Sequence, residues 1–359
     1  MGDILRPRAE IRFREELEAL ARFDERPKPS SWQLSPHAVV QYLMGTMLPD
    51  GVVISPKYIG SQRIIEVAVA TLATDRALLL VGVPGTAKTW VSEHLAAAIS
   101  GQSGLLVQGS AGTGEDSLKY TWNYARLLSQ GPDREALVPS PVFHAMEKGM
   151  LVRIEELTRL PAEVQDSLIT ILSEKTMPIP ELNESLFARK GFNLIATAND
   201  RDRGVNELSA ALRRRFNRVY MPLPDTAEEE IRIVRSSVER KEEGEFGAEI
   251  PSPLEEIRRV VTIFRELRSG QTDDGKQKLK VPTSTLSTAE AIAVIQGGQM
   301  LAIHFGDGRL RASDIAAALQ GAIVKDTVVD GPIWKDYLHG VIREREGWKD
   351  LYRACREFT

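Results

Sequence analysis

Residues 82–89 read Gly82-Val83-Pro84-Gly85-Thr86-Ala87-Lys88-Thr89. An apolar run, 77–81, precedes them, and a helical pattern with Gly101 as its stop follows them. A Gly-containing loop between a buried strand and a helix can present several backbone N–H donors inward, at the positive end of the helix dipole. A polyphosphate needs this arrangement, so the stretch predicts a nucleotide-binding loop.

Two side chains of the loop add chemistry that the backbone cannot supply. We expect Lys88 to reach the β- and γ-phosphates of a nucleotide and the Thr89 hydroxyl to ligate Mg²⁺. Ala87 stands where Gly usually precedes the Lys, and we expect it to have helical φ/ψ, where no positive φ is required. The alternative interpretation is an ordinary strand-to-helix turn with a surface Lys, which the flanking strand and helix disfavour.

Short apolar runs alternate with helical patterns from residue 59 to about residue 224. Beyond 77–81, strands are predicted at 105–107, 150–154, 192–198 and 219–221. A helix opened by Pro161 lies between the second and third of these. Such alternation implies a mostly parallel sheet with helices on both faces. The predicted fold class is therefore α/β, with the nucleotide-binding domain spanning 56–224.

The flanking segments have a different pattern. Arg and Glu alternate over 5–26, which predicts a charged amphipathic helix within an N-terminal helical extension, 1–55. A smaller all-α domain is predicted over 225–359. Its helices are expected near 253–269, 288–304, 313–324 and 334–357, with capping boxes at Thr226/Glu229 and Ser287/Glu290.

Two adjacent acids follow the apolar run 150–154. Carboxylates at the C-terminal end of a strand project into the crevice where such sheets bind ligands. We expect Glu155 to hold Mg²⁺ through water and Glu156 to activate the attacking water. The alternative is that both are acids favoured by the dipole of the helix beginning near Pro161. The loop at 82–89 favours the catalytic interpretation.

Asn199 and a basic triplet complete the candidate site. Asn199 closes the strand 193–198, so we expect it beside the acidic pair, where a neutral amide can orient water without repelling phosphate. The triplet 213–215 follows a short helix predicted over 207–212. A guanidinium stabilises charge that develops on a transferred phosphoryl group, so at least one of Arg214 and Arg215 is a candidate arginine finger. The alternative is a basic last helical turn.

Composition narrows the classes of function. The 359 residues include 46 basic and 50 acidic ones, a net charge of −4 that argues against a dedicated nucleic-acid binder. Cys355 is the single cysteine, which excludes an internal disulfide and a cysteine-based zinc site. No run reaches the roughly 18 apolar residues of a membrane helix. We therefore expect a cytoplasmic protein without membrane association.

Taken in order, these segments resemble the AAA+ ATPases, and within them the MoxR branch. Residues 82–89 look like its Walker A motif, and 154–161 look like its Walker B motif with the following turn. Residues 195–199 are similar to its sensor 1 strand, and 208–216 to its arginine-finger segment. Residues 176–192 resemble its hairpin before sensor 1.

The resemblance implies ATP and Mg²⁺ as cofactors and an AAA+ domain followed by a helical lid. It implies a hexameric ring in which Arg215 acts on the neighbour's nucleotide. It further implies chaperone-like remodelling of a client protein, usually with a partner that carries a von Willebrand A-type domain. The nucleotide-binding residues by this resemblance are Ile59, Gly60, Gly82, Val83, Pro84, Gly85, Thr86, Ala87, Lys88, Thr89 and Trp90.

Two positions depart from the family pattern. Glu155 replaces the usual Asp of Walker B, and residues 271–308 contain no Arg where sensor 2 is expected, with Ala289 or Leu286 at the corresponding position. These departures motivate an alternative function, a nucleotide-gated scaffold whose bound ATP holds an assembly together. A second alternative is an AAA+ motor acting on nucleic acid, against which the mildly acidic charge counts.

Overall fold

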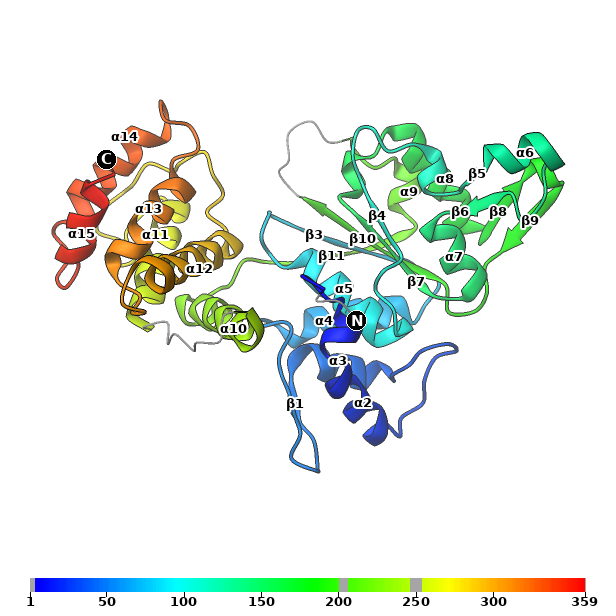
Figure 1. Cartoon of the computed structure of the whole chain (residues 1–359), viewed down its shortest axis with the longest axis horizontal. Coiled ribbons are helices and arrows are strands. Elements are labelled where there is room, and N and C mark those ends of the chain that lie inside the picture. The colour runs from blue at the N-terminus through cyan, green and yellow to red at the C-terminus, as the bar shows by residue number, and fades with distance from the viewer. Residues whose placement is uncertain (1–3, 200–205, 246–253, 359) are drawn as a thin grey trace. The chain divides into compact units, whose positions relative to one another are not determined.

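The computed structural model describes residues 4–199, 206–245 and 254–358. Its contacts group into two compact units, Met1–Gly82 with Ala87–Met221 and Val83–Thr86 with Pro222–Thr359. The first unit is built on a sheet, whereas the second consists of helices (Figure 1). The predicted α/β class with a following helical region is confirmed. Among the described residues, no helix is both long and apolar enough to cross a membrane.

The first unit contains a five-stranded parallel sheet. Its strands in spatial order are β11 (Phe216–Tyr220), β3 (Ala77–Gly82), β10 (Asn193–Asn199), β7 (Leu151–Glu155) and β4 (Leu106–Gln108). Each pairing is parallel. The strand predicted at 219–221 begins earlier than expected, because the polar residues Asn217 and Arg218 conceal its alternation. The carboxyl ends of β3, β7 and β10 therefore meet at one edge of the sheet.

Helices cover both faces of this sheet. Along β3, Leu78 and Leu80 face one core cluster, whereas Leu79 and Val81 face the other, because successive strand residues point to opposite faces. The first cluster includes α4 (Gln62–Leu72) and α5 (Lys88–Ser100), and the second includes α7 (Pro141–Lys148) and α8 (Ala162–Ser173). Burial on both faces explains why β3 reads as a continuous apolar run.

The N-terminal residues form a layer that shares its core with α4 and α5. Its elements are α1 (Ala9–Arg12), α2 (Arg14–Phe23), α3 (Pro36–Met44), β1 (Thr46–Met47) and β2 (Val53–Ile54). The single helix predicted over 5–26 is wrong. The helix is interrupted at Phe13, whose φ of −111° and ψ of 29° are not helical and whose buried ring lies 5.1 Å from the His94 ring of α5, measured between centroids. Packing of this aromatic ring therefore accompanies the break.

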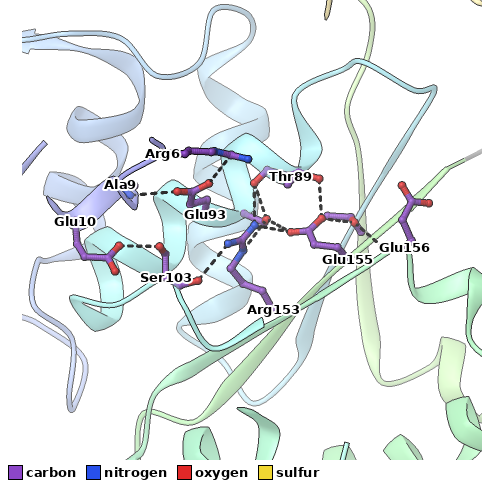
Figure 2. Close-up of polar contacts among 11 residues, drawn as sticks. Arg6, Ala9, Glu10, Thr89, Glu93, Ser103, Arg153, Glu155 and Glu156 are labelled. Atoms are coloured by element: carbon purple, nitrogen blue, oxygen red, sulfur yellow. Dashed lines mark hydrogen bonds and ion pairs between the residues drawn. The ribbon is translucent and has the colours of Figure 1, made fainter. Parts of the chain in front are cut away.

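Helix α1 is fastened to α5 and to the turn that follows α5. The Glu93 carboxylate of α5 accepts hydrogen bonds from the Ala9 amide and the Arg6 guanidinium, both at 3.1 Å. The Ser103 hydroxyl in turn donates to the Glu10 carboxylate at 2.7 Å. Figure 2 shows both contacts. A carboxylate at the start of a helix stabilises its free N–H groups, so α5 supplies the cap of α1.

Two hairpins project from the sheet domain. The first pairs β5 (Tyr120–Trp122) with β6 (Leu137–Pro139) around α6 (Tyr124–Gln130). The second pairs β8 (Thr176–Ile179) with β9 (Glu184–Phe187), where the hairpin was predicted. The Tyr120 hydroxyl donates to the Glu181 carboxylate at 2.7 Å and so links the two hairpins. Short 3-10 turns lie at Glu115–Ser117, Leu157–Arg159 and Pro180–Leu182.

The second unit is a helical assembly with its own buried core. Its helices are α10 (Ala227–Glu245), α11 (Leu254–Ser269), α12 (Thr288–Phe305), α13 (Ala312–Ile323), α14 (Asp330–Tyr337) and α15 (Lys349–Arg356). The continuous helix predicted over 334–357 is wrong, because a π-helical turn, Leu338–Ile342, and Gly347 with a φ of 76° interrupt it. The capping box of Ser287 and Glu290 is confirmed.

In the second unit, Arg259 is bonded to three carboxylates. The buried Arg259 guanidinium bonds to Glu255 at 2.7 Å, to Glu256 at 3.1 Å and to Asp350 at 2.9 Å. Burial raises the pKa of Glu256 to about 7, and the charges of Asp350 and Glu255 add to this effect against the attraction of Arg259. Glu256 therefore binds a proton more readily in the folded protein than in the unfolded chain.

Candidate functional site

The last residue of the loop before α5 has a left-handed backbone conformation. Ala87 has φ 62° and ψ 19°, and Lys88 is the first residue of the helix. Our expectation of helical φ/ψ at Ala87 is therefore wrong. This conformation costs a residue with a Cβ about 1–2 kcal/mol. The first turn of α5 is thus held in place against a local strain, as is common at ligand-binding loops.

The Lys88 side chain folds back over the loop that precedes it. Its ammonium donates to the Gly82 carbonyl oxygen at 2.9 Å, and the residue is buried. The Thr86 hydroxyl donates to the Val83 carbonyl oxygen, also at 2.9 Å, which tightens the turn. An ammonium has three donors and a point-like charge, so a lysine at this position is suited to a phosphate-rich ligand.

Glu155 ends β7 with a buried carboxylate. Its Oε2 accepts from the hydroxyls of Thr89 at 2.8 Å and Thr197 at 2.6 Å. Its Oε1 accepts from the Ser92 hydroxyl at 2.6 Å and the Arg153 guanidinium at 2.7 Å. Burial alone would raise the pKa of Glu155, but Arg153 and the three hydroxyls outweigh burial and hold this pKa below its usual range. Glu155 is therefore an ionised carboxylate beside Thr89 (Figure 2).

Glu156 points in a different direction from its neighbour. It has φ 57° and ψ 45°, and its amide donates to the Thr197 hydroxyl at 3.1 Å. The Asn199 side-chain amide donates to both carboxylate oxygens, at 3.1 and 3.0 Å, and the Arg159 Nε lies 3.4 Å from Oε2. Because Glu156 has this left-handed conformation, the two carboxylates lie in different surroundings. That of Glu155 is buried beside Thr89, and that of Glu156 is partly exposed beside Asn199.

Sequence reasoning missed the polar residues that hold these acids in place. Arg153 and Glu155 are two residues apart in a strand and so share a face, which was a readable signal within the otherwise apolar run. In β10, Ala196 pairs with Ile154, which brings Thr197 next to Glu155. No pattern pointed to Thr197, because threonine is common in strands for reasons of packing alone.

The segment of Ile59 and Gly60 is fixed against α5. Gly60 has φ 151°, which residues with a Cβ rarely adopt, and a Cβ there would lie 2.8 Å from the Tyr58 hydroxyl oxygen, so glycine is favoured. The Trp90 indole N–H donates to the Lys57 carbonyl oxygen at 2.8 Å. The Trp90 side chain therefore links the helix of Lys88 and Thr89 to this segment, and direct contact of Trp90 with a nucleotide stays a prediction.

Helix α9 (Ala210–Arg213) is displaced from the helix predicted over 207–212. The Ser209 hydroxyl caps it by accepting the Leu212 amide at 3.2 Å, so the helix starts one residue after Ser209. Serine competes well for a helix N-terminus, which explains why the helix does not extend further back.

The two arginine-finger candidates differ in their surroundings. Arg215 donates from Nε to the Ser173 hydroxyl at 2.7 Å and from Nη1 to the Ala211 carbonyl oxygen at 2.6 Å. Arg214 is exposed. Arg214 is therefore the more accessible of the two, whereas the side chain of Arg215 is bonded to α8 and α9 of its own subunit.

Comparison with known proteins gives the family. Residues 77–216 match the AAA domain of the dynein-related subfamily, and residues 228–357 match the YehL-like AAA+ ATPase C-terminal domain. The YehL protein of Escherichia coli (strain K12) is 41% identical over 357 residues, which cover 97% of this chain and 96% of that protein. The chain belongs to the YehL-like AAA+ family. The predicted AAA+ and MoxR-like resemblance is thereby confirmed.

Other proteins are less similar to this YehL-like protein in sequence. Midasin of Dictyostelium discoideum is 29% identical over 154 residues, 42% of this chain and 2% of midasin. Thermotoga maritima RuvB (T158V) is 16% identical, with a TM-score of 0.45 over 85% of this chain and 80% of that chain. Brucella abortus NtrX in complex with ADP is 12% identical, with a TM-score of 0.47 over 75% and 56%. Neither structural score is high enough to support an inference.

Membership of the YehL-like family agrees with the parts of the fold described above. The first match begins at β3 and ends at the first residue of β11, so it covers β3, β4, β7 and β10 of the parallel sheet together with the acidic pair. The second match covers the helical unit from α10 to α15. The family therefore includes the helical unit as well as the nucleotide-binding fold.

Proposed function

We propose that this YehL-like protein binds ATP with Mg²⁺, hydrolyses it, and uses the resulting change of shape to remodel a partner protein in the cytoplasm. One observation carries the proposal. The carboxylates of the two adjacent acids at the end of β7 lie in two different places: Glu155 is bonded to the Thr89 hydroxyl and Glu156 to the Asn199 amide. One carboxylate can therefore serve a metal ion while the other is left to activate water.

The residues around Thr89 fit Mg²⁺. A hydroxyl and an ionised carboxylate are hard oxygen donors, the kind that Mg²⁺ prefers. Within the described ranges, no group of three or more His, Cys, Asp or Glu could hold a metal ion. Mg²⁺ commonly takes only one or two protein carboxylates and fills its remaining positions with water and phosphate oxygens. Thr89 and Glu155 would hold the ion, which would neutralise phosphate charge when bound.

ATP would lie on the loop Gly82–Thr89, with Lys88 as the phosphate-binding cation and the amides at the start of α5 as donors. Ile59 and Gly60 would contact the adenine. Glu156 is the candidate general base, and its partly exposed carboxylate can accept a proton from water. The Asn199 amide, bonded to both oxygens of Glu156, would orient that carboxylate and the water.

The proposed active assembly is a hexameric ring, and Arg214 is its better candidate for the arginine finger. Its exposed side chain is available to a neighbouring subunit, whereas Arg215 is bonded to Ser173 and Ala211 within its own subunit. We also propose a protein partner with a von Willebrand A-type domain, by analogy with the MoxR branch. This partner rests on the family resemblance alone.

Release of phosphate from ATP by the purified protein tests the proposal. Lys88→Ala should abolish nucleotide binding, whereas Glu156→Gln should keep nucleotide binding and lose turnover. Glu163→Gln, an exposed acid on α8, serves as the control and should match the wild type. Equal turnover in Glu156→Gln and wild type would reject the assignment of the base. The ATP-retaining Glu156→Gln variant is also suited to capturing the client and the partner.

A nucleotide-gated scaffold is the second candidate function. Both Glu155 oxygens are engaged by side chains, and Arg153 already balances the charge of this carboxylate. A site in which the metal-binding acid is committed to the protein is suited to holding a nucleotide for long periods. Ring assembly on ATP without measurable turnover, even with the partner present, would favour this candidate.

A further inference from the structure

Arg153 places a permanent positive charge at the buried end of the nucleotide site. It lies in β7, two residues before Glu155, and is 4% exposed. Its guanidinium donates to the Ser92 hydroxyl at 3.0 Å, to the carbonyl oxygens of Ser103 and Thr89 at 3.2 Å each, and to Glu155 Oε1 at 2.7 Å. Figure 2 shows the guanidinium between α5 and the carboxylate.

Each of these contacts restrains where the charge can lie. Two of the acceptors, Ser92 and the Thr89 carbonyl, belong to α5, the helix that starts at the nucleotide loop. The guanidinium is planar and presents its donors in a fixed fork, so four acceptors on three segments leave it little freedom. Arg153 is therefore built into the site and is not a surface charge that happens to lie nearby.

The charge balance here differs from that of a site with a lone carboxylate. An isolated carboxylate buried as deeply as Glu155 is strongly unfavourable, and it repels any anion brought close to it. With Arg153 in contact, the pair carries no net charge. A triphosphate approaching Thr89 therefore meets a neutral pair when Mg²⁺ is absent, and the attraction of the carboxylate for a divalent ion is reduced by the same cation.

We propose that Arg153 is a positioning residue that balances the charge of Glu155 and so sets how strongly nucleotide binding depends on Mg²⁺. This inference rests on the proposed function, since it presupposes that a nucleotide binds beside Thr89. Arg153 acts through Glu155 and does not touch the reacting atoms. The pairing also gives a reason for the longer acid at position 155, because Glu reaches the hydroxyls of Thr89 and Thr197 while its other oxygen stays on Arg153.

The test compares nucleotide affinity with and without Mg²⁺. Dissociation constants for ADP and for a non-hydrolysable ATP analogue are measured by calorimetry on the full chain, once in excess EDTA and once in excess Mg²⁺. The quantity of interest is the dissociation constant in EDTA divided by the dissociation constant in Mg²⁺, which we call the ratio. In Arg153→Met this ratio should rise about tenfold or more, because the uncompensated carboxylate repels the metal-free nucleotide and attracts Mg²⁺. Arg153→Lys keeps the charge and should keep the ratio.

Two further variants separate charge from packing. Glu155→Gln leaves the cation uncompensated, so the ratio should shift in the opposite direction; this variant decides the matter if Arg153→Met does not fold. Arg259, in the second unit, is also an ion-paired arginine and is 5% exposed. Arg259→Met removes it. It should lower stability and leave the ratio unchanged, since a purely structural loss does not act on the metal dependence.

The outcomes distinguish the two proposals. If the wild type binds no nucleotide under either condition, the proposed function is overturned and this inference with it. If the wild type binds and its ratio equals that of both Arg153→Met and Glu155→Gln, the inference alone is overturned. A ratio that falls in Arg153→Met would also overturn the inference, because loss of the positive charge can only raise the ratio if Arg153 balances Glu155.

Discussion

Replacing Ala87 by glycine should stabilise the protein. A left-handed residue with a Cβ costs about 1–2 kcal/mol, and Ala87 has φ 62° and ψ 19°. Glycine removes this cost but loses about 0.5–1 kcal/mol through the greater freedom of the unfolded chain. The net expectation for Ala87→Gly is a gain of about 0.5–1 kcal/mol in the free energy of unfolding.

Urea unfolding of the full chain, followed by tryptophan fluorescence, measures this difference. Two controls place glycine at positions where a gain in stability is not expected. Ala96→Gly, at a buried position in α5, should lose at least about 1 kcal/mol, because glycine is a poor helix former. Asn183→Gly, at a residue with φ 52°, should change little, because asparagine tolerates this conformation.

The result that refutes this reasoning is a loss of stability in Ala87→Gly. Such a loss would mean that Ala87 is not left-handed in the protein, or that its methyl group makes contacts worth more than the strain. A gain in stability accompanied by weaker nucleotide binding would be a separate finding. It would show that the alanine pre-orders the loop for its ligand at the expense of stability.

Three further outcomes are expected. Since the pKa of Glu256 is raised from 4.5 to about 7, the folded state holds an extra proton, and stability declines as the pH rises between these values. Glu256→Gln should flatten this decline and gain up to about 3 kcal/mol at pH 8 in urea unfolding, whereas Glu163→Gln, at an exposed acid of α8, should leave the decline unchanged. Arg214→Ala should lose turnover at an unchanged melting temperature, whereas Arg215→Ala should lose about 1–3 kcal/mol of stability. Thr197→Val should also cost about 1–3 kcal/mol, because it leaves buried polar groups without a partner; wild-type stability would refute the contacts assigned to this hydroxyl.

Much of the first unit could be predicted because its strands are buried on both faces. The run at 77–81 reads as continuous apolar sequence for this reason, and the strand ending at Glu155 follows the same logic. The interruption of the N-terminal helix at Phe13 could not be predicted, because it accompanies packing against His94, which lies far away in the sequence. The break at Leu338–Ile342 likewise leaves the helical spacing of apolar residues intact.

The candidate site was predictable where motif order and strand ends place residues. Lys88, Thr89, Glu155, Glu156 and Asn199 belong to segments whose carboxyl ends or helix start meet at one edge of the sheet. The conformation of Ala87 could not be predicted, since the identity of an alanine does not determine its backbone dihedrals. The partners of Glu155 were not predictable either, because they come from a helix and a neighbouring strand whose register only the structure gives.

The fastening of α1 to α5 has a mechanical consequence. Force applied to the start of the chain would pass through Ala9 and Glu93 into the helix whose first residues are Lys88 and Thr89. A second route runs from Glu10 through the Ser103 hydroxyl, and the carbonyl of the same serine accepts from Arg153. A protein that binds residues 6–10 would therefore be linked by two short chains of hydrogen bonds to the helix that begins with Lys88 and to Arg153.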